Sequence, residues 1–192
     1  MRIPSTAIVR TGRLPRIPWK NGAGTTREAA VFRAPTGTAD FRWRISVADI
    51  DQDSSFSTFF GADRHFVIVS LGSLQMNIDG EDRTAAYGRP ETFPGEADVS
   101  VKLTIGPTSV INLITRRASC TGKVAVERID GSLTPPANTV AVTLLDGAAW
   151  TDGQRLEPLD FVMCGPGRAE VQFKDALVAA ISVFPASHPG LR

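Results

Sequence analysis

The sequence predicts an all-β protein, and three observations lead to this expectation. Several short stretches are apolar and rich in β-branched side chains, which is typical of strands. Asp-Gly and Pro-Gly pairs, which favour turns, separate these stretches. The 17 glycines and 13 prolines interrupt the 192-residue chain too often for long helices. The expected architecture is therefore a sandwich or barrel of short strands.

Five stretches carry the strongest strand pattern. They are residues 41–50 (FRWRISVADI), 64–72 (RHFVIVSLG), 109–117 (SVINLITRR), 138–147 (NTVAVTLLDG) and 176–184 (ALVAAISVF). Turns are expected between strands at Asp79-Gly80, Pro94-Gly95, Asp146-Gly147, Asp152-Gly153 and Gly165-Pro166-Gly167. The segments between successive turns are short, as in small β-barrels.

The chain also contains a weak internal repeat. Residues 72–99 and 147–171 both read as strand, hairpin turn, short strand, Pro-Gly turn and strand. Asp79-Gly80 aligns with Asp152-Gly153, and Pro94-Gly95 aligns with Pro166-Gly167. Chance similarity of turn residues is the alternative explanation.

This order of elements resembles the double-stranded β-helix of cupins. Gly88, followed by Pro94 and Gly95, also resembles the second cupin sequence motif. Two copies predict a bicupin, with two jelly-roll barrels over residues 1–118 and 119–192. The second domain is short, so we expect strands from the N-terminal end to complete its sheet.

Composition excludes several classes of function. The 21 basic and 20 acidic side chains nearly balance, which argues against a nucleic-acid partner. No stretch is long and apolar enough to predict a signal peptide or membrane partner, so a soluble cytoplasmic protein is expected. Cys120 and Cys164 form no CxxC pair, and two reduced thiols are favoured over a disulfide.

The scarcity of histidine argues against the usual cupin metal site. Metal-binding cupins use three histidines and a glutamate, whereas this chain has only His65 and His188. We therefore expect no metal and no cofactor. His65 is expected to pack beside an apolar strand, although it could instead serve as a base.

Two predicted strands place arginines and short polar residues on one face. In the first, Phe41, Trp43, Ile45 and Val47 alternate with Arg42, Arg44 and Ser46. In the second, Ile111, Leu113 and Thr115 alternate with Asn112, Ile114 and Arg116. Neither polar row contains Asp or Glu, and arginine binds carboxylates through two parallel bonds. We expect Arg42 to be solvated and the other polar residues to form an anion pocket; a solvated sheet face is the alternative.

The stretch WKNGAGTTRE, residues 19–28, fits the same pocket. Trp19 could supply an apolar wall, and glycines at 22 and 24 would let the backbone approach a ligand. Lys20, Asn21 and Arg27 could donate hydrogen bonds, while Glu28 could hold one of the cations. A solvated loop is the alternative.

These segments are similar to successive signatures of the HutD/Ves family. The similar segments are WKNGAGTTRE, FRWRISVADI, FSTFFGADRHFVIV, FPGEADV and NLITRR, which together cover roughly residues 15 to 120. The resemblance implies a bicupin without the metal histidines. This chain has Ala23 where many members have glycine. The site residues implied by the rows and the resemblance together are Trp19, Lys20, Asn21, Gly22, Thr26, Arg27, Glu28, Arg44, Ser46, Arg64, Asn112 and Arg116.

The resemblance leaves two functions open. HutD proteins accompany histidine-degradation genes, and the Ves branch is associated with environmental stress. The first hypothesis is a sensory or regulatory protein that binds a small carboxylate, either urocanate or N-formylglutamate. The second is a metal-independent hydrolase or isomerase that uses Glu28 or His65 as its acid-base group. A homodimer is open under both hypotheses.

Overall fold

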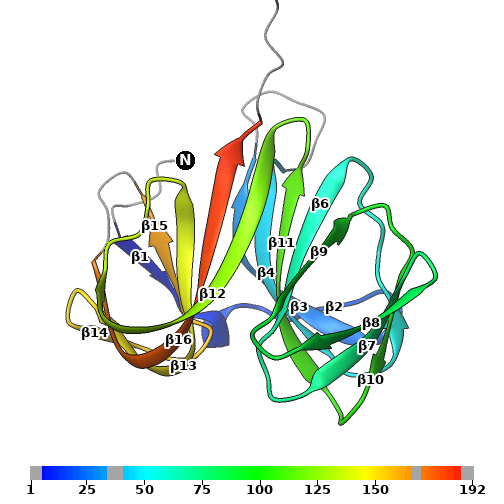
Figure 1. The fold of residues 1–192 in the computed structure, drawn as a ribbon, viewed down its shortest axis with the longest axis horizontal. Helices are drawn as coiled ribbons and strands as arrows, with labels where there is room; N and C mark the ends of the chain where they lie inside the picture. The colour runs from blue at the N-terminus through cyan, green and yellow to red at the C-terminus, as the bar shows by residue number, and fades with distance from the viewer. Residues whose placement is uncertain (1–5, 34–40, 166–169, 187–192) are drawn as a thin grey trace, which may run out of the picture.

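The computed structural model describes residues 6–33, 41–165 and 170–186, and these residues lie almost entirely in β-strands (Figure 1). The all-β expectation is confirmed. In chain order the elements are β1 (Thr6–Val9), the 3-10 helix η1 (Thr11–Arg13), β2 (Ile17–Pro18), β3 (Gly24–Phe32), β4 (Trp43–Ile50), β5 (Ser54–Ser55), β6 (Ala62–Ile68), β7 (Ser73–Ile78), β8 (Glu81–Ala86), β9 (Pro90–Pro94), β10 (Val99–Leu103), β11 (Thr108–Arg116), β12 (Cys120–Leu133), β13 (Thr139–Thr151), β14 (Gln154–Leu156), β15 (Phe161–Cys164) and β16 (Val171–Pro185).

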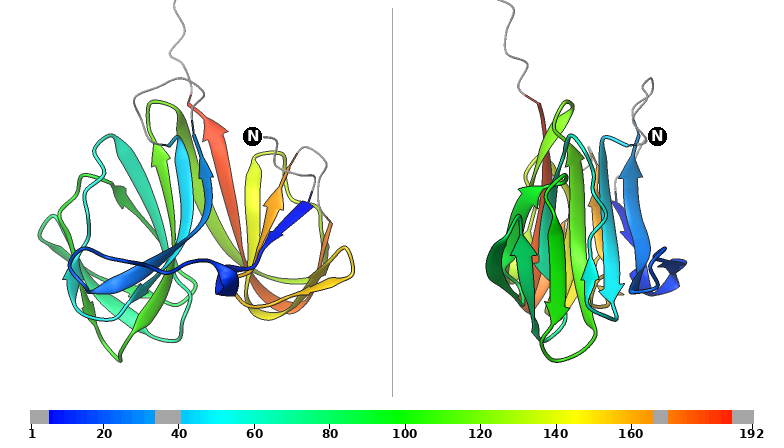
Figure 2. Two further views of the ribbon diagram at one scale, coloured as in Figure 1. Left: turned by 180° about the vertical axis from the view of Figure 1, so that it is seen from behind. Right: turned by 90° about the vertical axis from the view of Figure 1, so that its right-hand side faces the viewer.

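The strands form three sheets. The central sheet has the order β2-β3-β4-β11-β6-β9, and the outer sheet has the order β5-β10-β7-β8. The C-terminal sheet has the order β1-β15-β13-β16-β12, with β14 paired to β13. Figures 1 and 2 show two lobes: the central and outer sheets form one, and the C-terminal sheet forms the other. Strand β1 joins the C-terminal sheet, although it comes from the other end of the chain.

The division into domains 1–118 and 119–192 stays a prediction. The observed sheets divide the chain after β11, with the exception of β1. Within the described residues, the order of the strands also fits the repeat. In that alignment β7 corresponds to the end of β13, β8 to β14, β9 to β15 and β10 to β16. Pro166-Gly167, which the repeat aligns with Pro94-Gly95, lies outside the described residues, as does His188.

The central sheet packs on both faces, and its side chains alternate accordingly. Trp43, Ile45 and Val47 of β4 join a buried cluster that contains Phe161 and Ile181 of the C-terminal sheet. The opposite face of the central sheet joins another buried cluster with the outer sheet. That cluster includes Ala48, Ile50, Phe66, Leu74, Met76, Val99 and Val110. Residues at odd and even positions of β4 therefore enter different cores.

Phe41 breaks the expected alternation. It packs with Ala62 and Ile114, not on the face that holds Trp43. The physical reason is that β4 begins only at Trp43, so the two-residue period does not extend to Phe41. Arg42 is half-buried rather than solvated, and its Nη2 donates to the carbonyl oxygen of Ser119 at 3.0 Å.

Two predicted Asp-Gly turns are confirmed. Asp79 and Gly80 both have positive φ, at 50° and 88°, and they connect β7 to β8. Asp152 and Gly153 have φ of 48° and 71° and connect β13 to β14. Two consecutive residues with positive φ make the tight hairpin turn that suits the twist of paired strands.

The turn predicted at Asp146-Gly147 is wrong. Both residues lie inside β13, where the pairing with β16 shifts register. Gly147 has a φ of 88°, and a Cβ atom there would lie 2.3 Å from the carbonyl oxygen of Asp175. The glycine therefore serves a bulge within a long strand rather than a reversal of the chain.

Gly95 is expected to be intolerant of a side chain. Its N–H donates to the oxygen of Ala62 at 2.7 Å, and its own oxygen accepts from the N–H of Phe59 at 2.7 Å. An added Cβ would lie 2.4 Å from the Phe59 oxygen. Gly95→Ala should lower the free energy of unfolding by roughly 1–3 kcal/mol, measured by urea denaturation. Gly12→Ala is the control, because a Cβ at Gly12 meets nothing within 4 Å. Equal stability of the two variants would contradict the expected clash.

Candidate anion-binding site

A cavity of about 440 Å³ opens on the central sheet's outer-sheet face. Eight of the twelve predicted site residues line it: Trp19, Lys20, Asn21, Thr26, Arg44, Ser46, Arg64 and Asn112. The other lining residues are Pro18, Ala48, Ile50, Ser55, Phe56, Ser57, Phe59, Val110 and Ile114. The cavity therefore has a polar part, which comes largely from strands, and a substantial apolar wall.

Strand register brings the polar residues together. On β11, Asn112 lies opposite Ser46 of β4. Two residues further along, Ile114 lies between Arg44 of β4 and Arg64 of β6. Residues two apart on a strand share a face, so these side chains point to the same side of the sheet. Arg44, Ser46 and Asn112 of the rows inferred from sequence thus meet in one place, whereas Arg116 does not line the cavity.

Arg64 is buried without an acidic partner. Its side chain is 5% exposed, and it donates to Asn112 Oδ1 and to the Ser57 oxygen, both at 3.4 Å. Its guanidinium lies over the rings of Phe56, at 4.7 Å, and Phe93, at 5.3 Å. These rings offer their negative π-faces to the cation.

The Arg64 charge is electrostatically costly in the empty protein. Burial and, to a smaller extent, the neighbouring charge of Arg44 together lower the pKa of Arg64 to about 10. A cation whose pKa falls on folding is less stable in its charged form than it is in water. A bound anion would reverse this effect by supplying an opposite charge.

Arg44 is the second cation of the cavity. Its guanidinium lies 5.8 Å from the ring of Phe41 and 5.7 Å from that of Phe59, and its Nε is buried without a hydrogen-bond partner. Burial lowers the pKa of Arg44, while the charge of Glu28 partly opposes the shift. Among the described residues, no carboxylate lies within ion-pair distance of Arg44 or Arg64.

The remaining polar groups are mainly free donors. Asn112 Oδ1 accepts from Arg64, so its NH₂ group remains to donate. Thr26 Oγ1 accepts from Trp19 Nε1 at 2.8 Å, which leaves the hydroxyl proton of Thr26 for another acceptor. Ser46 contributes a further hydroxyl. A ligand rich in acceptor oxygens and carrying negative charge would satisfy these groups together.

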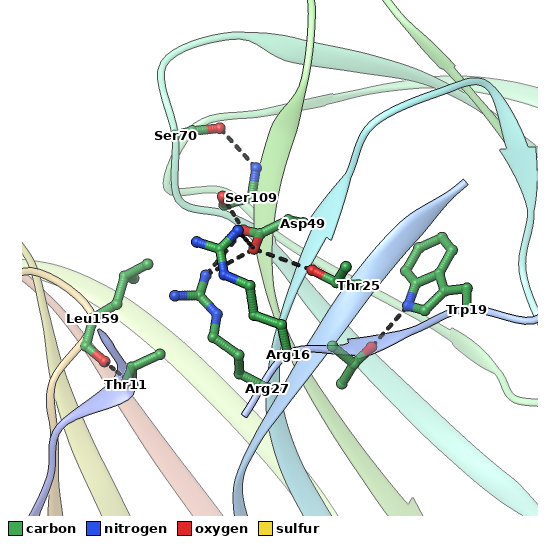
Figure 3. Close-up of polar contacts among 10 residues, drawn as sticks. Thr11, Arg16, Trp19, Thr25, Arg27, Asp49, Ser70, Ser109 and Leu159 are labelled. Atoms are coloured by element: carbon green, nitrogen blue, oxygen red, sulfur yellow. Dashed lines mark hydrogen bonds and ion pairs between the residues drawn. The ribbon is translucent and has the colours of Figure 1, made fainter. Parts of the chain in front are cut away.

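Arg27 does not reach the cavity, which corrects the prediction. Its Nη2 lies 2.9 and 3.1 Å from the two carboxylate oxygens of Asp49, on the other face of the sheet (Figure 3). Ser109 Oγ also donates to Asp49, at 2.7 Å. Thr26 points into the cavity, so the next residue on β3 must point away from it.

Three other predicted residues lie near the cavity without lining it. Arg116, at the end of β11, donates to the Phe60 oxygen at 2.7 Å and stacks on Phe41 at 4.9 Å. Glu28 is exposed and lies opposite Ser46, so it faces the same side as Arg44. Gly22, with a φ of 71°, forms a turn in which its N–H donates to the Trp19 oxygen.

The loop before β3 is fixed by its own hydrogen bonds. Asn21 donates through Nδ2 to Ser54 Oγ at 2.9 Å and accepts the Ala23 N–H at 3.1 Å, so its amide is occupied although it lines the cavity. A Cβ at Gly24 would lie 2.2 Å from the Asp49 oxygen and 3.3 Å from Trp19 Cε3. Glycine at 24 thus permits the close approach that positions Trp19.

His65 lies on the face opposite the cavity. It pairs in register with Leu113, is 8% exposed, and its Nδ1 lies 3.1 Å from Thr92 Oγ1. Burial lowers its pKa. His65 is therefore the packed histidine that sequence favoured, and it lies away from any ligand in the cavity.

The two cysteines, candidate metal ligands and candidate membrane-spanning helices concern the rest of the described structure. Cys120 and Cys164 are both free thiols. Over residues 6–33, 41–165 and 170–186, no three His, Cys, Asp or Glu side chains gather as metal ligands. In the same ranges, no helix has the length and apolar character needed to cross a membrane.

Apart from Trp19, the aromatic residues of the site were not among the predicted site residues. Phe56, Phe59 and Phe93 surround Arg64, and Phe41 contacts Arg44 and Arg116. The segment FSTFF, residues 56–60, could have indicated these rings, because it places three phenylalanines outside the predicted strands, where apolar rings still require a partner. Sequence gave no indication that the partner would be a cation.

Comparison with known proteins identifies the family. The family model described as HutD matches residues 12–180. The chain belongs to the HutD family. Protein Ves of Citrobacter koseri is 34% identical over 148 residues, which cover 76% of this chain and 75% of that protein. An uncharacterized 21.2 kDa protein in the hutC 3′ region of Pseudomonas putida is 36% identical over 108 residues, 56% of each chain.

Solved structures confirm the cupin fold of this HutD-family chain. HutD from Pseudomonas fluorescens SBW25, solved in a formate condition, is 26% identical, with a TM-score of 0.78. The match covers 94% of this chain and 98% of that one. A cupin 2 conserved barrel domain protein from Leptotrichia buccalis has a TM-score of 0.60 over 95% and 98% of the chains. At 14% identity, this second likeness concerns the fold alone.

Replacement of Arg64 should reveal the cost of its burial. Arg64→Met is expected to leave the empty protein equally stable or to stabilise it by about 1–3 kcal/mol, because it removes an unpaired buried charge and retains packing against the rings. Arg27→Met is the matched control and should destabilise, because it leaves the half-buried Asp49 carboxylate with only the exposed and more distant Arg16, at 3.7 Å, as a cationic partner. Urea denaturation of both variants would measure the difference. A similar loss of unfolding free energy in the two variants would show that other interactions already compensate the buried charge of Arg64 in the absence of a ligand.

Proposed function

We propose that this protein binds a small carboxylate, an intermediate of histidine degradation such as urocanate or N-formylglutamate, in a sensory or regulatory role. The observation that carries the proposal is the pair Arg44 and Arg64, which lines one cavity without a carboxylate partner among the described residues. Each of these cations could donate to a carboxylate, as could the Asn112 amide and the Thr26 hydroxyl.

The relatives support a link to histidine degradation. The Pseudomonas putida relative lies in the hutC 3′ region, and the similar structure from Pseudomonas fluorescens is named HutD. That structure was solved in a formate condition, which suggests formate as the smallest carboxylate to include in a binding assay.

The enzymatic alternative has one acid-base candidate near the cavity. Glu28 faces the same side as Arg44, whereas His65 faces the opposite side. Incubation with urocanate or N-formylglutamate, followed by chromatography of the products, would test for turnover. Turnover that disappears in Glu28→Gln would replace the binding proposal with an enzymatic one.

Calorimetric titration with urocanate, N-formylglutamate and formate tests the proposal. We expect Arg44→Ala to weaken binding by about ten- to a hundredfold, since a hydrogen bond to a charged group contributes about 1.5–3 kcal/mol. Arg42→Ala is the control, because Arg42 lies outside the cavity and donates to Ser119. Binding that is absent in the wild type, or unaffected by Arg44→Ala, would refute the proposal.

Affinity should also depend on pH at both ends. The ligand carboxylate must be ionised, so binding should weaken below about pH 4, near the usual pKa of such acids. Binding should also weaken as pH rises through about 10, because Arg64 then loses its proton. Titrations from acid to alkaline pH, with circular dichroism to confirm folding, would check this profile. An affinity that stays constant as the pH rises through 10 would show that the charge of Arg64 does not contribute to ligand binding.

A further inference from the structure

The N-terminal segment of the chain connects the two lobes and ends at the cavity wall. Strand β1 belongs to the C-terminal sheet, whereas β2 pairs with β3 of the central sheet, and Trp19 of the cavity follows β2 directly. Figures 1 and 2 show this segment, in blue, crossing from one lobe to the other. We propose that residues 10–19, here called the strap, are anchored on the C-terminal lobe by Asp160, and that this anchor positions Trp19 in the cavity.

The anchor on the C-terminal lobe consists of an ion pair and a neighbouring hydrogen bond. Arg10 Nη1 donates to Asp160 Oδ2 at 2.6 Å. Asp160 is buried, and its Oδ2 also accepts the Glu157 N–H at 2.9 Å, so its own lobe holds the carboxylate in place. At the next position of the strap, the buried Thr11 hydroxyl donates to the Leu159 oxygen (Figure 3). The start of the strap is therefore fixed to the C-terminal lobe.

The strap is short and stiff between this anchor and the cavity. Two backbone hydrogen bonds, of 2.9 and 3.2 Å, close the turn that η1 forms. Two residues separate the end of this turn, at Leu14, from the start of β2, at Ile17. Prolines at 15 and 18 fix the backbone angle φ on both sides of Arg16, which reduces the freedom of the segment. A displacement at the anchor would therefore be transmitted to β2.

Strand β2 is weakly held by its own pairing. It consists of Ile17 and Pro18, which pair with Thr26 and Thr25 at the edge of the central sheet. Pro18 has no N–H to donate to this pairing. Ile17 is 56% exposed, so its side chain contributes little packing. The position of β2 therefore depends on the contacts at its two ends.

Local contacts at the cavity end of the strap are the competing explanation. The Trp19 N–H donates to the Gly24 oxygen at 2.9 Å, and Trp19 Nε1 donates to Thr26. Arg16 Nη1 lies 3.7 Å from Asp49 Oδ2 (Figure 3), but Arg16 is exposed, and such pairs contribute little. If these contacts alone position the Trp19 ring, removal of the distant anchor will leave the ring unchanged.

The anchor would give the C-terminal lobe a part in a site that lies in the other lobe. The cavity is lined by residues between 18 and 114, all of which precede the C-terminal strands. The interior of the C-terminal sheet is largely filled by apolar side chains, such as Leu144, Phe173 and Val178. Asp160 is thus a positioning residue, because it acts on the cavity through Trp19 and lies away from any ligand there.

A neutral replacement of the anchor tests this role without any ligand. The double variant Arg10→Gln/Asp160→Asn removes both charges together, so no buried charge is left unpaired. Fluorine NMR of protein labelled with fluorotryptophan would report on Trp19, Trp43 and Trp150, and Trp19→Phe would assign the Trp19 signal. We expect the double variant to shift or broaden the Trp19 signal. The signal of Trp43, which lies in the core between the lobes, should remain unchanged.

Arg128→Gln/Asp175→Asn is the matched control for this experiment. It removes an ion pair of 2.7 Å from β12 and β16 of the same lobe and should leave the Trp19 signal unchanged. Circular dichroism would confirm that both double variants are folded. An unchanged Trp19 signal in Arg10→Gln/Asp160→Asn would show that local contacts suffice and would overturn the inference. An equal change of the Trp43 signal would also overturn it, because the variant would then disturb the packing between the lobes as a whole.

Binding measurements extend the test to affinity, and this part rests on the proposed function. In calorimetric titration with N-formylglutamate, Arg10→Gln/Asp160→Asn should bind about three- to tenfold more weakly than the wild type. The control pair Arg128→Gln/Asp175→Asn should bind as the wild type does. Equal affinities of the two double variants would overturn the role of the anchor in binding. Absence of wild-type binding to urocanate, N-formylglutamate and formate would refute the proposed function, whereas the fluorine signals test the strap independently of it.

Discussion

The pairing of β11 with β4 on one side and with β6 on the other determines how the central sheet divides its side chains between two faces. It fixes which residues of the central sheet face the C-terminal sheet and which face the cavity. A shift by one residue would send Arg44, Ser46 and Asn112 into the apolar cluster around Trp43 and Ile45. The apolar packing of one face thus secures the position of the polar groups on the other.

Burial of two arginines in one cavity is stabilised by rings rather than by carboxylates. Phe59 contacts both guanidinium groups, and Phe56 and Phe93 complete the surroundings of Arg64. Cation–π contacts are weaker than a buried ion pair, but they leave the hydrogen-bond donors unoccupied. Arg27, which is paired with Asp49, shows the alternative arrangement, in which the charge is satisfied and unavailable to a ligand.

Sequence patterns predicted those parts of the site that depend on local geometry. Alternation along β4 and β11 was sufficient to place Ser46 and Asn112 on one face, and Asp-Gly pairs predicted two hairpins. Alternation could not place Arg27, because the choice between Thr26 and Arg27 as the inward residue depends on the register of β3 with β4. The predicted face of Phe41 and the predicted turn at Gly147 were wrong for a similar reason. The start of a strand and the position of a bulge both depend on contacts that are distant in sequence.

Under the proposed function, the buried charge of Arg64 would couple ligand occupancy to the lifetime of the chain. A ligand that binds only the folded state lowers the fraction of unfolded molecules, and the effect increases with ligand concentration. Cellular proteases act on unfolded molecules, so a change of about 1–2 kcal/mol in the free energy of unfolding can change protein abundance several-fold. A protein whose empty state carries an unpaired buried cation would therefore accumulate when its ligand is abundant and be degraded when the ligand is scarce.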